Sequence, residues 1–398
     1  MRLTIETLPG SPVHQRRNEY VECKGIGHPD TICDALVEAV STALAQMYNR
    51  ELGSIAHFNV DKALLAAGQC AKGFLEGELK QPMRFFLGDR ATFAVGARAL
   101  PVLETVEEAI SLWLGRHLPR VRLGQELVLA PVLAPGSAPL RSIYEADQAA
   151  ASNDTSGAVG FAPRTPTEEL VLAATRYLNS PDFKALFPDT GQDVKVFAVR
   201  TDDKVELTIA MPFFCDAIDS EATYFRRKDE VLHALHQYFA STSSLTIELT
   251  LNALDQRGRG ADGLYLTLTG TSAEDADSGQ VGRGNRTYGF IAFARPLGGE
   301  AAPGKNPIAH VGKIYSAASQ SLAEGIHKRF PHLLEVYVYL AVRIGEPILR
   351  PWVSIQVVLP QGHTLDFIES QLRAFVSEEL ERLPEFCQRL VRGEVPLY

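Results

Sequence analysis

Residues 193–211 read DVKVFAVRTDDKVELTIAM, and this stretch sets the first expectation for the fold. Residues 194–200 and 205–211 are rich in valine and other apolar residues, which is typical of strands. The polar residues Thr201 to Lys204 between them predict a hairpin turn. We therefore expect strands that follow one another directly along the chain and pair antiparallel.

Strand and helix patterns continue in the same way along the rest of the chain. Strands are also predicted within 55–69 and at 244–251, 263–269, 287–294, 334–344 and 352–359. One helix is predicted directly after Asp30, which is its expected N-cap. Further helices are predicted at 105–117, 165–178 (capped by Thr165 or Thr167), 220–240, 311–329 and 364–382. Glycine and proline predict loops at 132–139, 256–263 and 295–307. Because strands come in pairs with helices between the pairs, we expect an α+β fold of mostly antiparallel sheets covered by helices, and not a doubly wound parallel sheet.

The composition is that of a folded globular protein and argues against some functions. The chain has 398 residues, 45% of them hydrophobic and 22% charged, and a formal net charge of −9. A net acidic surface argues against a general binder of nucleic acid or of anionic membranes. No apolar run approaches about 20 residues and the N-terminus lacks an apolar core, so we expect neither a membrane span nor a signal peptide. Five cysteines without a CxxC pair predict reduced thiols in a cytoplasmic protein, not disulfides or a zinc site.

The segment Lys24-Gly25-Ile26-Gly27-His28-Pro29-Asp30 leads into the first predicted helix. Backbone N–H groups at a helix start favour an anion, and His28 is placed to donate a hydrogen bond to a phosphate. Asp30 offers oxygen ligands to Mg²⁺, which often joins one or two carboxylates to nucleotide phosphates. The structural alternative is that Asp30 only caps the helix, His28 is a loop histidine and Asp34, one turn further on, is solvated.

Three later segments combine glycine with polar or basic side chains. Residues 152–161, SNDTSGAVGF, form a polar turn in which Asp154 can contact a metal, a ribose or an amine, unless it is an ordinary Asx turn. Residues 275–286, DADSGQVGRGNR, and 299–313 are glycine-rich, and they carry four basic residues: Arg283, Arg286, Lys305 and Lys313. Such loops let backbone amides and cations surround a polyphosphate, whereas a solvated charge run would not need so much glycine.

Two widespread nucleotide motifs are matched only superficially. Gly299 to Lys305 fits the G-x-x-x-x-G-K part of a P-loop, but Asn306 follows where a P-loop has the Ser or Thr that binds Mg²⁺. The glycines of 279–286 lack the strand–turn–helix setting of a dinucleotide fingerprint. We therefore expect neither a P-loop nor a Rossmann site.

Five segments, in order along the chain, carry a resemblance to a known family. They are GHPDTICD at 27–34, NDTSGAVGFAP at 153–163, DVKVFAVR at 193–200, DSGQVGRGNR at 277–286 and GKNPIAHVGKIY at 304–315. Together they resemble S-adenosylmethionine synthetase (methionine adenosyltransferase) in its archaeal-type branch. The motifs stand in the family's order over nearly the whole chain, so the combination is much more specific than any one of them.

The resemblance implies a reaction and an architecture. In that family the sulfur of L-methionine attacks C5′ of ATP and displaces triphosphate, which is then cleaved to pyrophosphate and phosphate. The implied fold has three pseudo-symmetric, interlaced α+β subdomains, so that residues 1–398 form a single catalytic unit with no separable linker. The resemblance also implies Mg²⁺, an additional K⁺, and a homodimer with active sites at the interface.

The family's site residues carry over to matching positions of this chain. The resemblance implies that His28 contacts phosphate at the transferring centre and that Asp30 binds Mg²⁺. With His28, the implied catalytic residues are Lys195, Arg283 and Lys305, which bind the triphosphate. The further implied substrate contacts are Asp154 near methionine or ATP, Asp193 beside Lys195, Asp277 at methionine's amino group or the nucleotide, and the cations Arg286 and Lys313.

The chain departs from the familiar branch in three places. Gly284 stands where that branch has a lysine after Arg283, and Arg286 is the expected substitute. Residues 309–311, Ala-His-Val, stand where a lysine and an aspartate are familiar. Lys313 is expected to replace that lysine, and no residue is assigned as the second metal carboxylate. The candidates for the methionine-side acid are His57, Asp61 and Gln69.

Two other functions remain as alternatives at this stage. One is a non-catalytic nucleotide-binding relative, such as a regulatory subunit. The other is a P-loop kinase or ATPase, which would release ADP.

Overall fold

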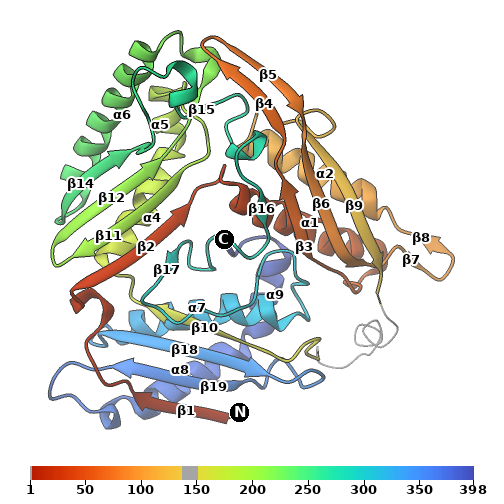
Figure 1. Cartoon of the computed structure of the whole chain (residues 1–398). Coiled ribbons are helices and arrows are strands. Elements are labelled where there is room, and N and C mark those ends of the chain that lie inside the picture. Colours follow the sequence, from red (N-terminus) through yellow and green to blue (C-terminus); the bar gives the residue numbers. More distant parts are fainter. Residues whose placement is uncertain (1, 137–150) are drawn as a thin grey trace.

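Three mixed sheets surround the centre of the molecule, and the longer helices lie behind them (Figure 1). The structure is a computed structural model and describes residues 2–136 and 151–398. Over these ranges, none of the helices has both the length and the apolar character needed to cross a membrane.

The first sheet contains β14 (Thr246–Leu251), β12 (Lys204–Ala210), β11 (Lys195–Thr201), β2 (Asn18–Lys24) and β17 (Ile291–Ala292). The second contains β16 (Gly279–Gln280), β3 (Asn59–Ala66), β6 (Met83–Ala91) and β9 (Leu127–Pro135). The third contains β1 (Arg2–Thr7), β19 (Trp352–Val358), β18 (Glu335–Val342) and β10 (Ser156–Ala162). The described residues also form three small strand pairs: β4 (Gln69–Gly73) with β5 (Glu76–Gln81), β7 (Ala94–Val95) with β8 (Arg98–Ala99), and β13 (Phe213–Phe214) with β15 (Leu266–Thr267).

One topology is repeated in the three sheets. Each has a central antiparallel pair: β11–β12, β3–β6 or β18–β19. The second strand of the pair is flanked by a parallel strand, which is β14, β9 or β1. The first strand is flanked by an antiparallel strand, which is β2, β16 or β10. Each sheet is thus mostly antiparallel with one parallel pair, which agrees with the expectation of mostly antiparallel sheets.

Helices follow the same repeat. α2 (Val102–His117) and α6 (Glu221–Thr242) lie in the chain between the second strand of a pair and its parallel neighbour. A helix is the usual crossover between parallel strands. In the third unit α8 (Glu369–Glu381) and α9 (Leu383–Val391) follow β19, and the parallel strand β1 comes from the other end of the chain.

The units are interlaced because the strand before each principal helix belongs to another unit's sheet. α1 (Pro29–Leu52) packs on β3, while β2, which precedes it, pairs with β11. α4 (Pro166–Leu178) packs on β11, while β10 pairs with β18. α7 (Val311–Arg329) packs on β18, while the two strands before it, β16 and β17, pair with β3 and β2 of the other two sheets. A further helix, α5 (Pro181–Leu186), follows α4.

Each sheet packs against its helices through a separate hydrophobic core. The cores centre on residues such as Val196 in the first unit, Leu36 in the second and Ile355 in the third, all fully buried. Gly160 of β10 shows how closely sheet and helix approach, because a Cβ there would lie 2.3 Å from the backbone N of Gln320 in α7. The predicted α+β class with interlaced units is therefore confirmed in the described chain.

Several sequence predictions need correction. The N-cap of α1 is His28, not Asp30, because Pro29 takes the first helical position and the His28 ring accepts the Asp30 N–H. The strands predicted at 263–269 and 287–294 shorten to β15 and β17, since their flanks run as loops. Of the loop predicted at 132–139, residues up to Pro135 continue β9, and 137–139 lie outside the described residues. The helix predicted at 364–382 begins as a 3-10 turn and is α-helical only from Glu369.

Candidate active site

His28 stands at the start of α1 with its ring fixed by the backbone. Its Nδ1 accepts the N–H of Asp30 at 3.2 Å. Because a backbone N–H can only donate, the proton of the neutral ring must sit on Nε2. Burial, reinforced by the nearby Lys24, lowers the pKa of His28 to about 4. His28 is therefore a neutral hydrogen-bond donor at pH 7.

Asp30 joins the helix start to the glycine-rich segment 277–286. Its Oδ1 accepts the N–H of Gln280 at 2.9 Å, and its Oδ2 lies 2.9 Å from the Lys24 ammonium. Lys24 Nζ also donates to the carbonyl of Arg283 at 2.7 Å. These contacts place the Arg283 backbone beside Asp30, although the two residues are far apart in the sequence.

A third segment, at the start of β11, meets the same place. Lys195 is the register partner of Lys24, and the Glu22 carboxylate lies 3.5 Å from Lys195 Nζ and 3.6 Å from Lys24 Nζ. Gly27 donates its N–H to the carbonyl of Gln192 at 3.1 Å, so the loop before His28 rests on the residues before β11. A Cβ at Gly27 would lie only 2.3 Å from the Gln192 carbonyl carbon, which explains the glycine.

Asp193 is buried and holds the segment that carries Asp277. Its Oδ2 accepts the backbone N–H of Ser272 at 2.8 Å, and the Ser272 carbonyl accepts the N–H of Asp277 at 3.0 Å. Burial raises the pKa of Asp193 to about 6, although the Ser272 hydrogen bonds oppose the shift. The two aspartates that the sequence predicted at the site are thus brought close by one turn.

Lys305 belongs to a second buried group on the other side of segment 277–286. Its ammonium contacts the Asp61 carboxylate and lies 3.1 Å from Glu300 Oε2. Burial raises the pKa of Asp61, but Lys305 outweighs burial and the pKa ends below its ordinary value. Lys305, Asp61, Glu300 and Gln280 line one cavity of about 460 Å³. Because Gln280 also contacts Asp30, the two groups of charged residues adjoin.

Lys313 lies beneath this group and is fully buried. Its ammonium lies 2.7 Å from Glu38 Oε2 and donates to Ser41 Oγ at 2.9 Å. Ser41 Oγ in turn donates to the carbonyl of Lys305 at 2.8 Å. The contact of Lys313 with phosphate stays a prediction, and it would require the Glu38 pair to open.

The remaining predicted residues differ in the hydrogen bonds and ion pairs that they make with the rest of the protein. Asp154 Oδ1 accepts the N–H of Thr155 at 2.7 Å, and Asn153 donates its N–H to the carbonyl of Ala309 at 3.3 Å, so this turn lies beside the start of α7. Arg286 Nη1 donates to the carbonyl of Gly282 at 2.8 Å. The Arg283 side chain is exposed and makes no ion pair with another residue of 2–136 or 151–398.

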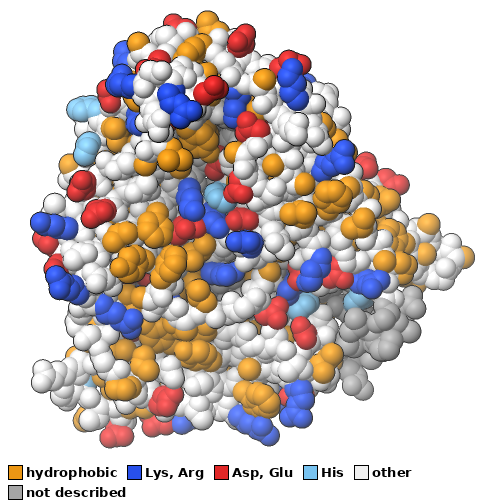
Figure 2. All heavy atoms as spheres, in the orientation of Figure 1, with side chains coloured by type: hydrophobic (Ala, Val, Ile, Leu, Met, Phe, Trp, Pro, Cys, Tyr) orange, Lys and Arg blue, Asp and Glu red, His pale blue; other side chains and the backbone are white. Residues whose placement is uncertain are grey.

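Figure 2 shows Lys, Arg, Asp, Glu and His side chains gathered at a hollow near the middle of the sheet side, bordered by hydrophobic patches. Sequence reasoning missed several members of the contact network, among them Lys24, Glu22, Glu38 and Glu300. It named Asp61 only as a candidate acid for methionine. No spacing in the sequence signals the pairings of Lys305 with Asp61 and of Lys313 with Glu38, because these residues lie far apart in the chain.

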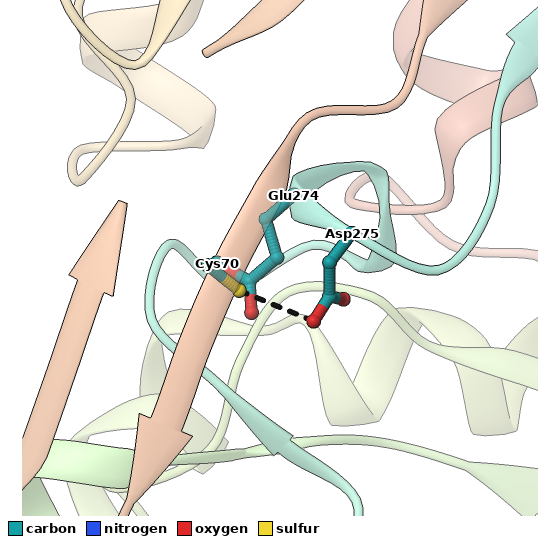
Figure 3. A group of neighbouring side chains, drawn as sticks. All are labelled: Cys70, Glu274 and Asp275. Atoms are coloured by element: carbon teal, nitrogen blue, oxygen red, sulfur yellow. Dashed lines mark hydrogen bonds between the residues drawn. The ribbon is translucent and has the colours of Figure 1, made fainter. Parts of the chain in front are cut away.

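A separate acidic group lies near β4 (Figure 3) and has another explanation. Cys70 Sγ donates to Asp275 Oδ2 at 3.2 Å, with Glu274 alongside. Lys72 lies 3.2 Å from Glu274 and 2.8 Å from Asp275, and Glu274 Oε2 also accepts the N–H of Thr269 at 2.7 Å. The carboxylates are therefore already satisfied by a lysine and by backbone donors, as in a loop anchor.

Asp34 provides a test of how segment 277–286 is held. Its Oδ1 accepts the N–H of Gly282 at 2.8 Å, and burial raises its pKa from 3.8 to about 7. The protonated form thus favours the folded chain. This contribution is complete below about pH 4 and is lost as the pH rises through about 7.

We expect the free energy of unfolding of the parent protein to fall between pH 4 and 7 more steeply than that of Asp34→Asn, which keeps an oxygen acceptor for Gly282 but cannot ionise. Thermal unfolding of both proteins across this range measures the difference. The exposed carboxylate variant Asp216→Asn should retain the parent slope. Equal slopes for the parent and Asp34→Asn would contradict the buried state of this carboxyl group.

The fold brings lysine, arginine and histidine side chains from three interlaced α+β units to neighbouring positions at one site. The family model for S-adenosylmethionine synthetase (AdoMet synthetase) matches residues 1–394. The chain belongs to the S-adenosylmethionine synthetase family. Its enzyme class is therefore methionine adenosyltransferase.

Individual relatives agree with this assignment. The chain is 39% identical to an S-adenosylmethionine synthase from Pyrobaculum aerophilum over the full length of both. It is 36% identical to a probable S-adenosylmethionine synthase from Aquifex aeolicus over 98% of each. A solved S-adenosylmethionine synthetase from Campylobacter jejuni superposes with a TM-score of 0.58 and 14% identity, covering 96% of this chain and 95% of that one. The last similarity supports the fold alone.

Proposed function

We propose that the chain joins the sulfur of L-methionine to C5′ of ATP at the central hollow, displaces the whole triphosphate and cleaves it to pyrophosphate and phosphate. The observation that carries this proposal is the convergence of separate basic segments on one place. His28, Lys195 and Arg283 adjoin through Lys24 and Asp30, and Lys305 adjoins them through Gln280.

The chemistry of the reaction suits such a site. A thioether sulfur is neutral and needs no general base, so the barrier comes from alignment and from the charge that develops on the leaving triphosphate. Preorganised cations and N–H donors stabilise that charge where it develops. Lys195, Arg283, Arg286 and Lys305 supply the cations, and the neutral His28 ring supplies an Nε2–H donor.

The acidic residues receive the remaining roles. Asp277 is positioned through Ser272 and Asp193, so we assign it to the amino group of methionine or to the nucleotide. Asp154, beside the start of α7, is assigned to the same substrates from the other side. Asp61 is paired with Lys305 and is therefore assigned to holding that lysine, not to methionine.

Mg²⁺ is the metal that we propose for this site, with Asp30 as its ligand. Mg²⁺ prefers oxygen ligands and is commonly held by one or two carboxylates together with substrate phosphates. Asp30 offers such a carboxylate beside the proposed phosphate contacts, and Mg²⁺ would take the place of the Lys24 ammonium, which now lies 2.9 Å from Asp30 Oδ2. When bound, the ion neutralises charge on the phosphates. A role for K⁺ stays a prediction without an assigned residue.

We propose that the protein acts as a homodimer through the sheet side. Leu64, Phe86, Val128 and Val132 of the second sheet are 37–63% exposed and form an apolar surface there. Hydrophobic patches also border the hollow in Figure 2. A contiguous apolar surface of this kind is typical of a subunit interface. A second copy on this side would close the hollow from solvent and place the active site between subunits.

We also propose that residues 1–398 act as one catalytic unit, since no unit keeps all its strands without the others. The five cysteines form no disulfide in the structure, which supports a reducing compartment such as the cytoplasm.

Product analysis tests the proposed function. The purified chain with ATP, methionine and Mg²⁺ should yield S-adenosylmethionine, pyrophosphate and phosphate in equal amounts, and no ADP. ADP as the product would identify a kinase or ATPase instead. Nucleotide binding without turnover would identify a non-catalytic relative.

A further inference from the structure

His310 occupies the same structural position at the start of α7 that His28 occupies at the start of α1. Each histidine is the N-cap, and each Nδ1 accepts the N–H of the residue two positions further on, at 3.2 Å in both cases. The two helices also hold equivalent places in their units, each packed on the first strand of a central pair. As for His28, the bond from Gly312 leaves the proton of the neutral His310 ring on Nε2.

The surroundings of His310 keep it uncharged. The residue is 6% exposed. Burial is the main cause that lowers its pKa to about 4, and Lys305 lowers it further, while Asp61 and Glu300 act in the opposite direction. At pH 7 the ring therefore offers one hydrogen-bond donor, and within residues 2–136 and 151–398 that donor has no hydrogen-bond partner.

His310 lies beside the cavity that contains Lys305. The charged groups that influence its ring are Lys305, Asp61, Glu300 and Lys62, and all four line the cavity of about 460 Å³. Gly312, which the ring caps, touches the same wall. A Cβ at Gly312 would lie 2.8 Å from both Lys305 Cε and Glu300 Oε2.

We propose that His310 is a further catalytic residue, whose Nε2–H donates a hydrogen bond to the triphosphate beside Lys305. This inference rests on the proposed function of the same site. A neutral donor suits the position because it binds phosphate oxygen without repelling the adjacent ammonium of Lys305. It also supplies a contact on the side where Lys313 is engaged by Glu38. The site then has two matched histidine donors, His28 from α1 and His310 from α7.

The variant His310→Asn separates this role from capping. Asparagine is among the best N-cap residues, so it keeps an acceptor for the Gly312 N–H while it removes the Nε2–H. We expect kcat to fall by about 100-fold or more, as for the loss of one donor to developing charge. We expect binding of Mg²⁺-tripolyphosphate, measured by calorimetry, to weaken about tenfold, which corresponds to one hydrogen bond to a charged group. The melting temperature should stay within a few degrees, and the exposed-histidine variant His332→Asn should behave as the parent.

Normal turnover and normal tripolyphosphate binding in a folded His310→Asn would show that His310 is only a cap, and would overturn the inference. If that variant does not fold, the imidazole ¹⁵N spectrum of the parent gives the answer. Tripolyphosphate should shift the His310 Nε2–H resonance, and an unshifted resonance would overturn the inference. Lys305→Met and His28→Asn are measured in parallel. If they weaken tripolyphosphate binding and His310→Asn does not, this inference alone fails; if none of the three does, the proposed function fails with it.

Discussion

Lys305→Met lowers kcat by about two to three orders of magnitude while the chain still folds. Lys305 is buried and its ammonium is held by Asp61 and Glu300, so it is preorganised and needs no rearrangement when triphosphate departs. Removing one preorganised contact of this kind typically costs about 3–4 kcal/mol of transition-state stabilisation. Methionine keeps most of the buried aliphatic volume, so the loss is confined to the charge. Steady-state assays of S-adenosylmethionine formation measure the effect.

The matched control is Lys228→Met. Lys228 is also a largely buried lysine that pairs with an aspartate, Asp255, at 2.7 Å, but it lies on α6. The two variants should lose comparable stability in thermal unfolding, and only Lys305→Met should lose turnover. Equal kcat values for the two variants would remove Lys305 from the proposed mechanism.

Asp30→Asn raises the Mg²⁺ concentration needed for half-maximal activity by at least about tenfold, and activity at saturating metal stays well below that of the parent. The amide keeps an oxygen acceptor for the Gln280 N–H but carries no charge for a cation. Carboxylate charge is a main contribution to the binding of a hard divalent ion, and loss of contacts around a metal commonly costs 10- to 100-fold in affinity. Mg²⁺ titration of the initial rate measures the shift.

Asp182→Asn controls for the helix position of Asp30. Asp182 follows Pro181 in the first turn of α5, just as Asp30 follows Pro29 in α1. Its amide variant should leave the Mg²⁺ dependence unchanged. If Asp30→Asn titrates with Mg²⁺ like the parent, Asp30 is not the metal ligand.

Local features of the fold could be predicted from the sequence. The hairpin β11–β12 and the bounds of α7 agree with the predictions, since both depend on residues close together in the chain. The N-cap of α4 is Thr165, which forms a capping box with Glu168. Thr165 was one of the two N-cap candidates predicted from the sequence. The N-cap of α1 was assigned to the wrong residue because the usual cap preferences favour aspartate over histidine.

Long-range pairings could not be predicted in this way. β1 pairs with β19 from the opposite end of the chain, and β16 joins β3 across more than 200 residues. A strand's own sequence indicates which face it buries, but it does not indicate its neighbour. The interlaced arrangement was therefore expected only through the resemblance to a family.

The candidate site, too, could be predicted only in part, because its charged residues are paired with residues far away in the chain. Each motif was visible because glycine and charged residues cluster locally, as in 277–286. The partners of those charges were not visible, since Lys305 pairs with Asp61 and Lys313 with Glu38, which lie 244 and 275 positions away. Both lysines are paired with a carboxylate, but Lys305 lines the cavity, whereas Lys313 is fully buried beneath it.

The central claim is that basic groups from separate units converge on one leaving triphosphate. A structure of the protein with methionine, Mg²⁺ and a non-hydrolysable ATP analogue tests it most directly. We predict that His28, Arg283 and Lys305 all contact the phosphate chain of one bound nucleotide, with Asp30 at the metal. Density that places the phosphates against only one of these three side chains, or outside the hollow on the sheet side, would contradict the account.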